Sequence, residues 1–273
     1  MQRESDVSEV RVRTSEGMLV GCRDTEADVF FGIPYAAPPV GNLRFRSPRP
    51  PRAWDGARAA KQRGHPAVQS NPDFPAWLDP MPDSEDCLVL NVWAPRTDGL
   101  LPVMVWIHGG GFVYGSSGAP IYDGRQLATT GNVVVVSLNH RLNAFGYLWL
   151  GDIAPEYADE ANLGQQDIVA ALRWIQTNIA AFGGDPSNVT LFGESGGGAK
   201  ISALGTSPAA SGLFHRAIIQ SGSQTRLAER SEATDVAREY LDILGLTPDR
   251  VDFLMHATVS DLRSAADRII ATR

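Results

Sequence analysis

The most informative segment of the chain is Gly193-Glu194-Ser195-Gly196-Gly197-Gly198. The apolar and β-branched residues 189–192 precede it and predict a short buried strand. The residues that follow, 197–204, predict a helix. Glycine on both sides of Ser195 allows a turn so tight that the serine takes a strained backbone conformation. Its hydroxyl is then expected to stand free at the first amide of a helix, where an anion is best stabilised.

A second glycine-rich segment, His108-Gly109-Gly110-Gly111-Phe112, follows directly on the predicted strand 102–107. Consecutive glycines let bare backbone N–H groups approach a bound substrate, and a His-Gly-Gly-Gly segment supplies oxyanion donors in esterases. A Gly-x-Ser-x-Gly motif between a strand and a helix is the nucleophile elbow of the α/β-hydrolase fold. The alternative is a pair of ordinary glycine-rich turns with a passive serine. The order of the two motifs along the chain argues against it.

Composition narrows the class of protein. A chain of 273 residues with 43% hydrophobic content can bury a substantial core. The net charge of -7, with no dense basic cluster, argues against nucleic-acid binding. The first 16 residues lack the apolar segment of a signal peptide, and no apolar stretch is long enough for a membrane span. Cys22 and Cys87 make no disulfide framework, so we expect a cytoplasmic protein.

Strands and helices are predicted to alternate around the two motifs. Continuous apolar runs at 103–107 and 133–138 are typical of strands covered on both faces of a sheet. Between 163 and 182 apolar residues recur at spacings of three and four, which predicts a helix that Gly183 ends. A further strand is predicted at 216–220. The series predicts an α/β fold with a mostly parallel central sheet flanked by helices.

The two ends of the chain differ in character. Residues 10–20 predict a small hairpin, and the proline-rich stretch 32–54 predicts little regular structure. A strand is predicted at 87–93. Near the other end, 233–244 and 260–270 predict amphipathic helices, and we expect Ser260 to be the N-cap of the second one.

Five further segments resemble the type-B carboxylesterase/lipase family, to which para-nitrobenzyl esterase-like enzymes and the cholinesterases belong. They are Phe31-Gly32-Ile33-Pro34-Tyr35-Ala36, Gly41-Asn42-Leu43-Arg44-Phe45, Ser84-Glu85-Asp86-Cys87-Leu88-Val89-Leu90-Asn91, Phe182-Gly183-Gly184-Asp185-Pro186 and Gln220-Ser221-Gly222-Ser223. The resemblance runs from the predicted hairpin to the C-terminal helices, so it covers nearly the whole chain.

This resemblance implies an α/β-hydrolase that cleaves carboxylic ester bonds through a serine, a histidine and an acidic residue. We expect a small-molecule ester substrate and neither a cofactor nor a metal ion. On the family pattern Ser195 is the nucleophile, and the backbone amides of Gly110, Gly111 and Gly196 form the oxyanion hole. The remaining matches are a buried acid beside the nucleophile at Glu194 and a structural ion pair of Arg44 with Glu85.

The chain departs from the family pattern at two single positions. The residue after the nucleophile is usually alanine and here is Gly196, whose extra backbone freedom is expected to loosen the oxyanion hole. Trp77 falls where the cholinesterases place a cation-binding tryptophan, with a packing role as the other interpretation.

Length is the largest departure. Members of the family are considerably longer, and their acidic residue and histidine come after the position at which this chain ends. His215 and His256, which lie downstream of Ser195, match no catalytic base. We therefore expect the N-terminal portion of an esterase, nearly inactive by itself. In this interpretation 1–225 is the N-terminal part of the catalytic domain, and 226–273 starts a helical region.

Three alternatives stay open from the sequence. A shorter hormone-sensitive-lipase-like esterase also uses a His-Gly-Gly-Gly segment, but it lacks the 32–45 segment seen here. A catalytically inactive, cholinesterase-like binding module would commonly lack the serine that this chain retains. Cleavage of an amide, carbamate or thioester would use the same site. The acyl and alcohol specificity and the oligomeric state are open as well.

Overall fold

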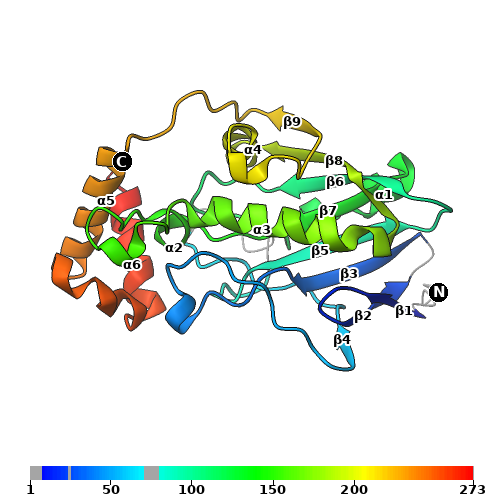
Figure 1. The fold of residues 1–273 in the computed structure, drawn as a ribbon, viewed down its shortest axis with the longest axis horizontal. Helices are drawn as coiled ribbons and strands as arrows, with labels where there is room; N and C mark the ends of the chain where they lie inside the picture. The colour runs from blue at the N-terminus through cyan, green and yellow to red at the C-terminus, as the bar shows by residue number, and fades with distance from the viewer. Residues whose placement is uncertain (1–7, 24–25, 71–79, 273) are drawn as a thin grey trace.

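A computed structural model describes residues 8–23, 26–70 and 80–272 (Figure 1). Within these ranges nine strands form one sheet in the order β1-β2-β3-β5-β7-β6-β8-β9, with β4 paired to β2. The strands are β1 (Ser8–Arg13), β2 (Met18–Arg23), β3 (Ala27–Pro34), β4 (Ala57–Ala59), β5 (Val89–Pro95), β6 (Leu101–Ile107), β7 (Val134–Leu138), β8 (Gly184–Glu194) and β9 (Arg216–Gln220). The helices are α1 (Arg125–Gly131), α2 (Asn143–Tyr147), α3 (Leu163–Asn178), α4 (Gly196–Gly205), α5 (Arg230–Ile243) and α6 (Val259–Ile270).

The sheet is mixed in strand direction. From β1 to β7 the neighbours β1/β2, β2/β3, β3/β5 and β5/β7 are antiparallel. The strands β7, β6, β8 and β9 run parallel to one another, as the predicted β-α-β series requires. Parallel strands end at the same edge of a sheet, so β6 and β8 deliver the segments that follow them to one place.

Helices cover both faces of the sheet, which explains the continuous apolar run in β7. Val134 and Val136 belong to the core cluster that contains Ile168 and Leu172 of α3. Val135, between them, faces the opposite way and packs with Ala128 of α1. Side chains alternate across a strand, so a strand buried on both faces favours apolar residues on both. The polar exception in β7 is Ser137, whose hydroxyl donates to Ser117 O at 3.3 Å.

The predicted helix at 163–182 is observed as two parts. The α-helix α3 ends at Asn178, and a 3-10 turn continues it over Ile179–Phe182. Gly183 then adopts a left-handed conformation, with φ of 80°, and starts the turn into β8. The expectation that Gly183 ends the helix is confirmed.

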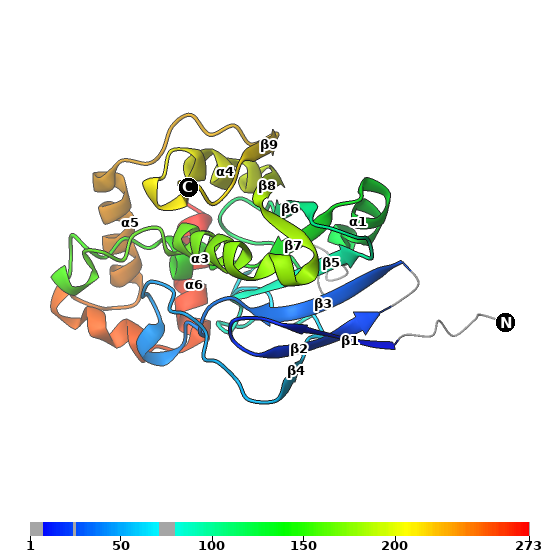
Figure 2. The ribbon, with the colours of Figure 1, turned by 45° about the vertical axis from the view of Figure 1, so that its right-hand side comes forward.

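The C-terminal residues form a second, separate core. Helices α5 and α6 pack together, and Tyr240, Leu262 and Leu254 of the 3-10 helix between them are buried with Phe45, from an earlier turn, and Phe145 of α2. Figures 1 and 2 show these helices grouped beside α2 at one end of the sheet. Division of the chain at residue 225 stays a prediction.

One expected cap is wrong. Helix α6 begins one residue earlier than predicted, and its N-cap is Thr258 rather than Ser260. The Thr258 hydroxyl accepts a hydrogen bond from the Asp261 amide at 3.1 Å, three residues on, as a capping side chain does. Ser260 lies inside the first turn instead, where Ser264 donates to its carbonyl oxygen.

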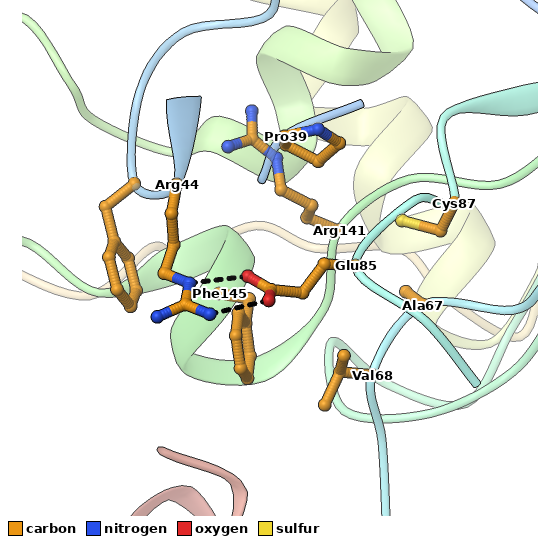
Figure 3. A pocket seen from close by; sticks show the side chains of 9 residues that line it. Pro39, Arg44, Ala67, Val68, Glu85, Cys87, Arg141 and Phe145 are labelled. Atoms are coloured by element: carbon orange, nitrogen blue, oxygen red, sulfur yellow. Dashed lines mark hydrogen bonds and ion pairs between the residues drawn. The ribbon is translucent and has the colours of Figure 1, made fainter. Parts of the chain in front are cut away.

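The predicted ion pair of Arg44 with Glu85 is confirmed, and it fastens the C-terminal helices to the rest of the chain. Arg44 Nε and Nη2 donate to the two Glu85 carboxylate oxygens at 2.6 and 2.7 Å, beside a small pocket (Figure 3). The same guanidinium donates through Nη1 to the carbonyl oxygens of Leu254 and Ala257. The side chains of Arg44 and Glu85 are only 9% and 10% exposed.

Removal of this carboxylate is expected to destabilise the chain. Glu85→Ala leaves a nearly buried guanidinium without a counter-charge, which costs about 2–3 kcal/mol of unfolding free energy. Urea denaturation followed by circular dichroism measures the change. The matched control is Glu9→Ala, which removes the exposed pair with Lys61 and should leave the midpoint nearly unchanged. Equal effects of both variants would contradict the structural role of the Arg44 pair.

Candidate active site

Ser195 forms the tight link between β8 and α4. Its backbone lies at φ of 52° and ψ of -123°, a region that side-chain-bearing residues rarely occupy. Two hydrogen bonds hold this conformation: the Ser195 amide donates to Gln220 O at 2.8 Å, and Ala199 N donates to Ser195 O at 3.0 Å. The strain is therefore maintained by both neighbouring elements, β9 and α4.

The glycines around Ser195 are required by close packing against the end of β6. A Cβ atom at Gly197 would lie 2.1 Å from Ile107 O, and one at Gly193 would lie 2.8 Å from the same oxygen. Gly222, after β9, must also lack a side chain, because a Cβ atom there would lie 2.0 Å from Ser195 O. The turn can sit this close to the sheet edge only without side chains at these positions.

The second glycine segment leaves the adjacent strand β6 and reaches the same place. Gly110 and Gly111 have φ of 85° and 64°, in the left-handed region that favours glycine. Gly110 O accepts hydrogen bonds from Val113 N at 3.2 Å and Tyr114 N at 3.1 Å, which close the loop into a turn. The segment is therefore an ordered turn rather than an open loop.

The turn and the serine link are in direct contact. A Cβ atom at Gly109 would lie 3.6 Å from Ser195 Cβ. A Cβ atom at Gly196 would lie 2.2 Å from Gly111 O and 2.6 Å from Gly111 N. The two segments, 85 residues apart in the chain, thus place the backbones of Gly111 and Gly196 against each other beside Ser195.

Backbone amides at this contact are free to donate. In the described part of the chain, no acceptor is seen for the N–H of Gly110 or of Gly111. Gly196 is the first residue of α4, and a helix offers no internal acceptor to its first amide. Ser195 is half-buried and Gly111 is exposed, so a small molecule can reach these donors.

Two buried histidines lie behind the glycine turn and support it. The ring of His108 stacks on that of His140 with centroids 4.7 Å apart, and His108 Nδ1 lies 2.9 Å from Gly109 O. Burial lowers the pKa of His108 to about 3, so the ring is neutral near pH 7. Gln69 adds a second support, accepting from Gly115 N and donating to Gly115 O at 2.8 and 3.0 Å.

No described contact joins any of the five histidines of the sequence to Ser195. His215 precedes β9 at the opposite end of the strand pair, about 20 Å from Ser195 along the strand direction. There His215 Nδ1 accepts from Val189 N at 3.1 Å. His256 is exposed at the end of a 3-10 helix between α5 and α6.

The expectation of a buried acid at Glu194 is wrong for this structure, because the side chain is exposed. Glu194 ends β8 beside β9, and all five residues of β9 are themselves exposed, so no described element covers the carboxylate. One carboxylate oxygen lies 3.1 Å from the position of a Cβ atom at Gly109, so Glu194 still borders the glycine turn.

Within the described residues, no group of three or more His, Cys, Asp or Glu side chains is placed to hold a metal ion. Trp77 lies outside the described residues. No helix in the described ranges combines the length and apolar content needed to cross a membrane.

Comparisons with known proteins agree on one family. The profile of the carboxylesterase family matches residues 8–272. Para-nitrobenzyl esterase of Bacillus subtilis (strain 168) is 44% identical over 260 residues, which cover 94% of this chain and 53% of that protein. Phenmedipham hydrolase of Pseudarthrobacter oxydans is 46% identical over 230 residues, covering 81% of this chain and 45% of its own length. These matches do not favour the shorter esterase or the inactive binding module.

Solved structures give the same answer for the fold. A PNB esterase structure superimposes with a TM-score of 0.89 at 44% identity, covering 96% of this chain and 54% of that one. The carboxylesterase EST55 of Geobacillus stearothermophilus superimposes with a TM-score of 0.87 at 46% identity. The chain spans about half the length of the curated relatives that it matches. It has the α/β-hydrolase fold and belongs to the carboxylesterase family.

Proposed function

We propose that this chain carries the nucleophile and the oxyanion hole of a serine carboxylesterase. The observation that carries the proposal is the contact of Gly111 with Gly196 beside the strained backbone of Ser195. It supports a site in which three amides with no acceptor among the described contacts gather around one serine hydroxyl, the arrangement that acyl transfer needs. The substrate class is a small-molecule carboxylic ester.

In the proposed reaction, Ser195 Oγ attacks the ester carbonyl carbon, and the carbonyl oxygen becomes an oxyanion. The amides of Gly110, Gly111 and Gly196 donate to that oxyanion, and each such donor contributes about 3 kcal/mol to the transition state. Collapse of this intermediate expels the alcohol and leaves an acyl group on Ser195. Water then attacks the acyl carbonyl carbon, and a second oxyanion forms in the same site. Its collapse breaks the bond to Ser195 Oγ, releases the carboxylic acid and restores the serine hydroxyl.

The base that takes the proton from Ser195 is proposed to come from outside the described residues. His108 and His140 are buried behind the glycine turn, and burial lowers the pKa of both. His215 and His256 make no described contact with the site. Without a base, an oxyanion hole and binding alone leave an acceleration of about a thousandfold over water.

The test is hydrolysis of para-nitrophenyl acetate by the 273-residue chain. We expect a slow rate that Ser195→Ala reduces to background and that His215→Ala and His256→Ala leave unchanged. A rate that does not depend on Ser195 would refute the esterase proposal. Fast turnover that His256→Ala abolishes would refute only the proposal that the base lies outside the described residues. A panel of ester, amide, carbamate and thioester substrates then shows which kind of bond the enzyme cleaves.

We also propose a cytoplasmic location. Cys22 and Cys87 are both free thiols in the structure, which suits a reducing compartment. Oxidation state measured by thiol alkylation of the freshly isolated protein tests this proposal, since a disulfide between molecules would contradict it.

A further inference from the structure

Lys200 is an unusual residue for the interior of an α/β fold. It lies on α4, five residues after Ser195, and its side chain is 0% exposed. None of the ion pairs among the described residues includes it. The chain has only two lysines, and the other, Lys61, is at the surface in a pair with Glu9. A buried lysine without a counter-charge is costly, so its contacts call for an explanation.

The ammonium group faces three acceptors. Lys200 Nζ donates to Gly111 O at 2.5 Å and to Gly196 O at 3.3 Å, and it lies 4.7 Å from the centre of the Phe112 ring. Two carbonyl oxygens and an aromatic face match the three N–H donors of a charged lysine. A neutral amine would turn a lone pair toward one of these electron-rich groups. The geometry is therefore that of the ammonium form.

We propose that Lys200 is a positioning residue that ties the glycine turn to the serine link and so holds the oxyanion hole together. This inference rests on the proposed function, because it assigns a role within that site. The two carbonyl oxygens bound by Lys200 belong to the same glycines whose amides are proposed to bind the oxyanion. One side chain thus bridges the two segments that must keep their spacing for catalysis.

The absence of a side chain at position 196 makes this bridge possible. A Cβ atom at Gly196 would lie 2.2 Å from Gly111 O, the oxygen that accepts the shorter Lys200 bond. An alanine there would push the Gly111 carbonyl away from Lys200. Gly196 was expected to loosen the oxyanion hole through its backbone freedom. The structure indicates that Lys200 offsets this effect: Gly196 leaves room for the Gly111 carbonyl group, and Lys200 holds that group by a hydrogen bond.

The groups around Lys200 leave its charge uncompensated. His108 and His140 face it from the ends of β6 and β7, and both stay neutral because burial lowers their pKa values. Tyr147 of α2 packs edge-on against the Phe112 ring, and burial raises its pKa well above the ordinary value. On α3, Gln165 donates to Lys200 O, and Asp167 is paired with Arg141.

The bridge is therefore expected to respond to pH. Burial lowers the pKa of Lys200 to about 7. Below this pH the ammonium donates to both carbonyl oxygens, and above it the group loses a proton and the bridge weakens. The oxyanion hole should be better ordered at pH 6 than at pH 8, and the neutral histidines add no titration in that range.

The first test is nuclear magnetic resonance, because it needs no ester turnover. With ¹³C-labelled lysine, the chain gives two Cε signals, and Lys61→Met identifies the surface one. We expect the amide signals of Gly110, Gly111 and Gly196 to shift with the same midpoint as the Lys200 Cε signal. Lys61→Met should preserve that shift, and Lys200→Met should remove it. Glycine amides that do not follow Lys200 would overturn the inference and leave the esterase proposal intact.

The second test is the rate at which a fluorophosphonate reacts with Ser195 at pH 6. Lys200→Met is expected to slow this reaction about tenfold or more. Lys200→Arg keeps a charge that does not titrate, so it should restore part of the rate and remove the change near pH 7. Gly196→Ala should slow the wild-type chain but add little to Lys200→Met. Thermal unfolding of each variant separates loss of the bridge from loss of the fold. Equal rates for folded Lys200→Met and the wild type would overturn the inference.

Discussion

Ser195→Ala is expected to abolish covalent capture of a fluorophosphonate by this chain. The probe forms its bond with the Ser195 oxygen, slowly because no described base takes the serine proton. The variant has no oxygen at the position proposed to face the amides of Gly110, Gly111 and Gly196. Intact-mass spectrometry measures the result as one added phosphonyl group on the wild type and none on the variant. The loss should be complete over the time in which the wild type reacts fully.

A matched control is available in the same neighbourhood. Ser221 also has a left-handed backbone, with φ of 52°, and follows the adjacent strand β9. It is exposed and does not border the glycine turn in any described contact. Ser221→Ala should therefore retain full capture. Capture that survives Ser195→Ala, or that disappears with Ser221→Ala alone, would contradict the assignment of the nucleophile.

Asp167→Ala is expected to produce the largest loss of stability among the variants considered. Asp167 lies on α3 and is 0% exposed. Its carboxylate accepts hydrogen bonds from Arg141 Nε at 2.8 Å, from Arg141 Nη2 at 2.7 Å and from the Arg141 backbone amide at 3.0 Å. Removal of the carboxylate leaves a buried guanidinium and a buried amide unpaired, which costs about 4–5 kcal/mol.

Urea denaturation measures this loss, with Asp235→Ala as the control. Asp235 forms an ion pair with Arg238 three residues on, but both side chains are largely exposed. The control should leave the unfolding midpoint unchanged. A loss below about 1 kcal/mol for Asp167→Ala would mean that Arg141 finds solvent in the variant, against the burial seen here.

The parts of the fold that the sequence predicted correctly are those that local pattern determines. The strand β9 was predicted at its observed bounds, and the predicted helix after Ser195 is α4. Both follow from short runs whose apolar spacing or glycine content allows few conformations. The antiparallel strand β3 was missed, since its partner β5 lies some sixty residues later and no local pattern shows that pairing.

At the candidate site, too, local pattern predicted the turn but not the contacts between distant segments. The motif around Ser195 predicted the turn, since close glycines permit little else. The exposure of Glu194 depends on what covers β9, which no local pattern states. Lys200 did carry a signal, because it is a charged residue within the mostly apolar and small-residue run of α4. Its meaning required the structure, since Gly111 and Gly196 approach each other only in the folded chain.

The most direct measurement is a crystal structure of the chain after reaction with a fluorophosphonate. We predict a phosphonyl group on Ser195 Oγ, with one phosphoryl oxygen about 3 Å from the amide nitrogens of Gly110, Gly111 and Gly196. A phosphonyl group on another residue would contradict the account. So would a phosphoryl oxygen that faces solvent more than about 4 Å from those three nitrogens.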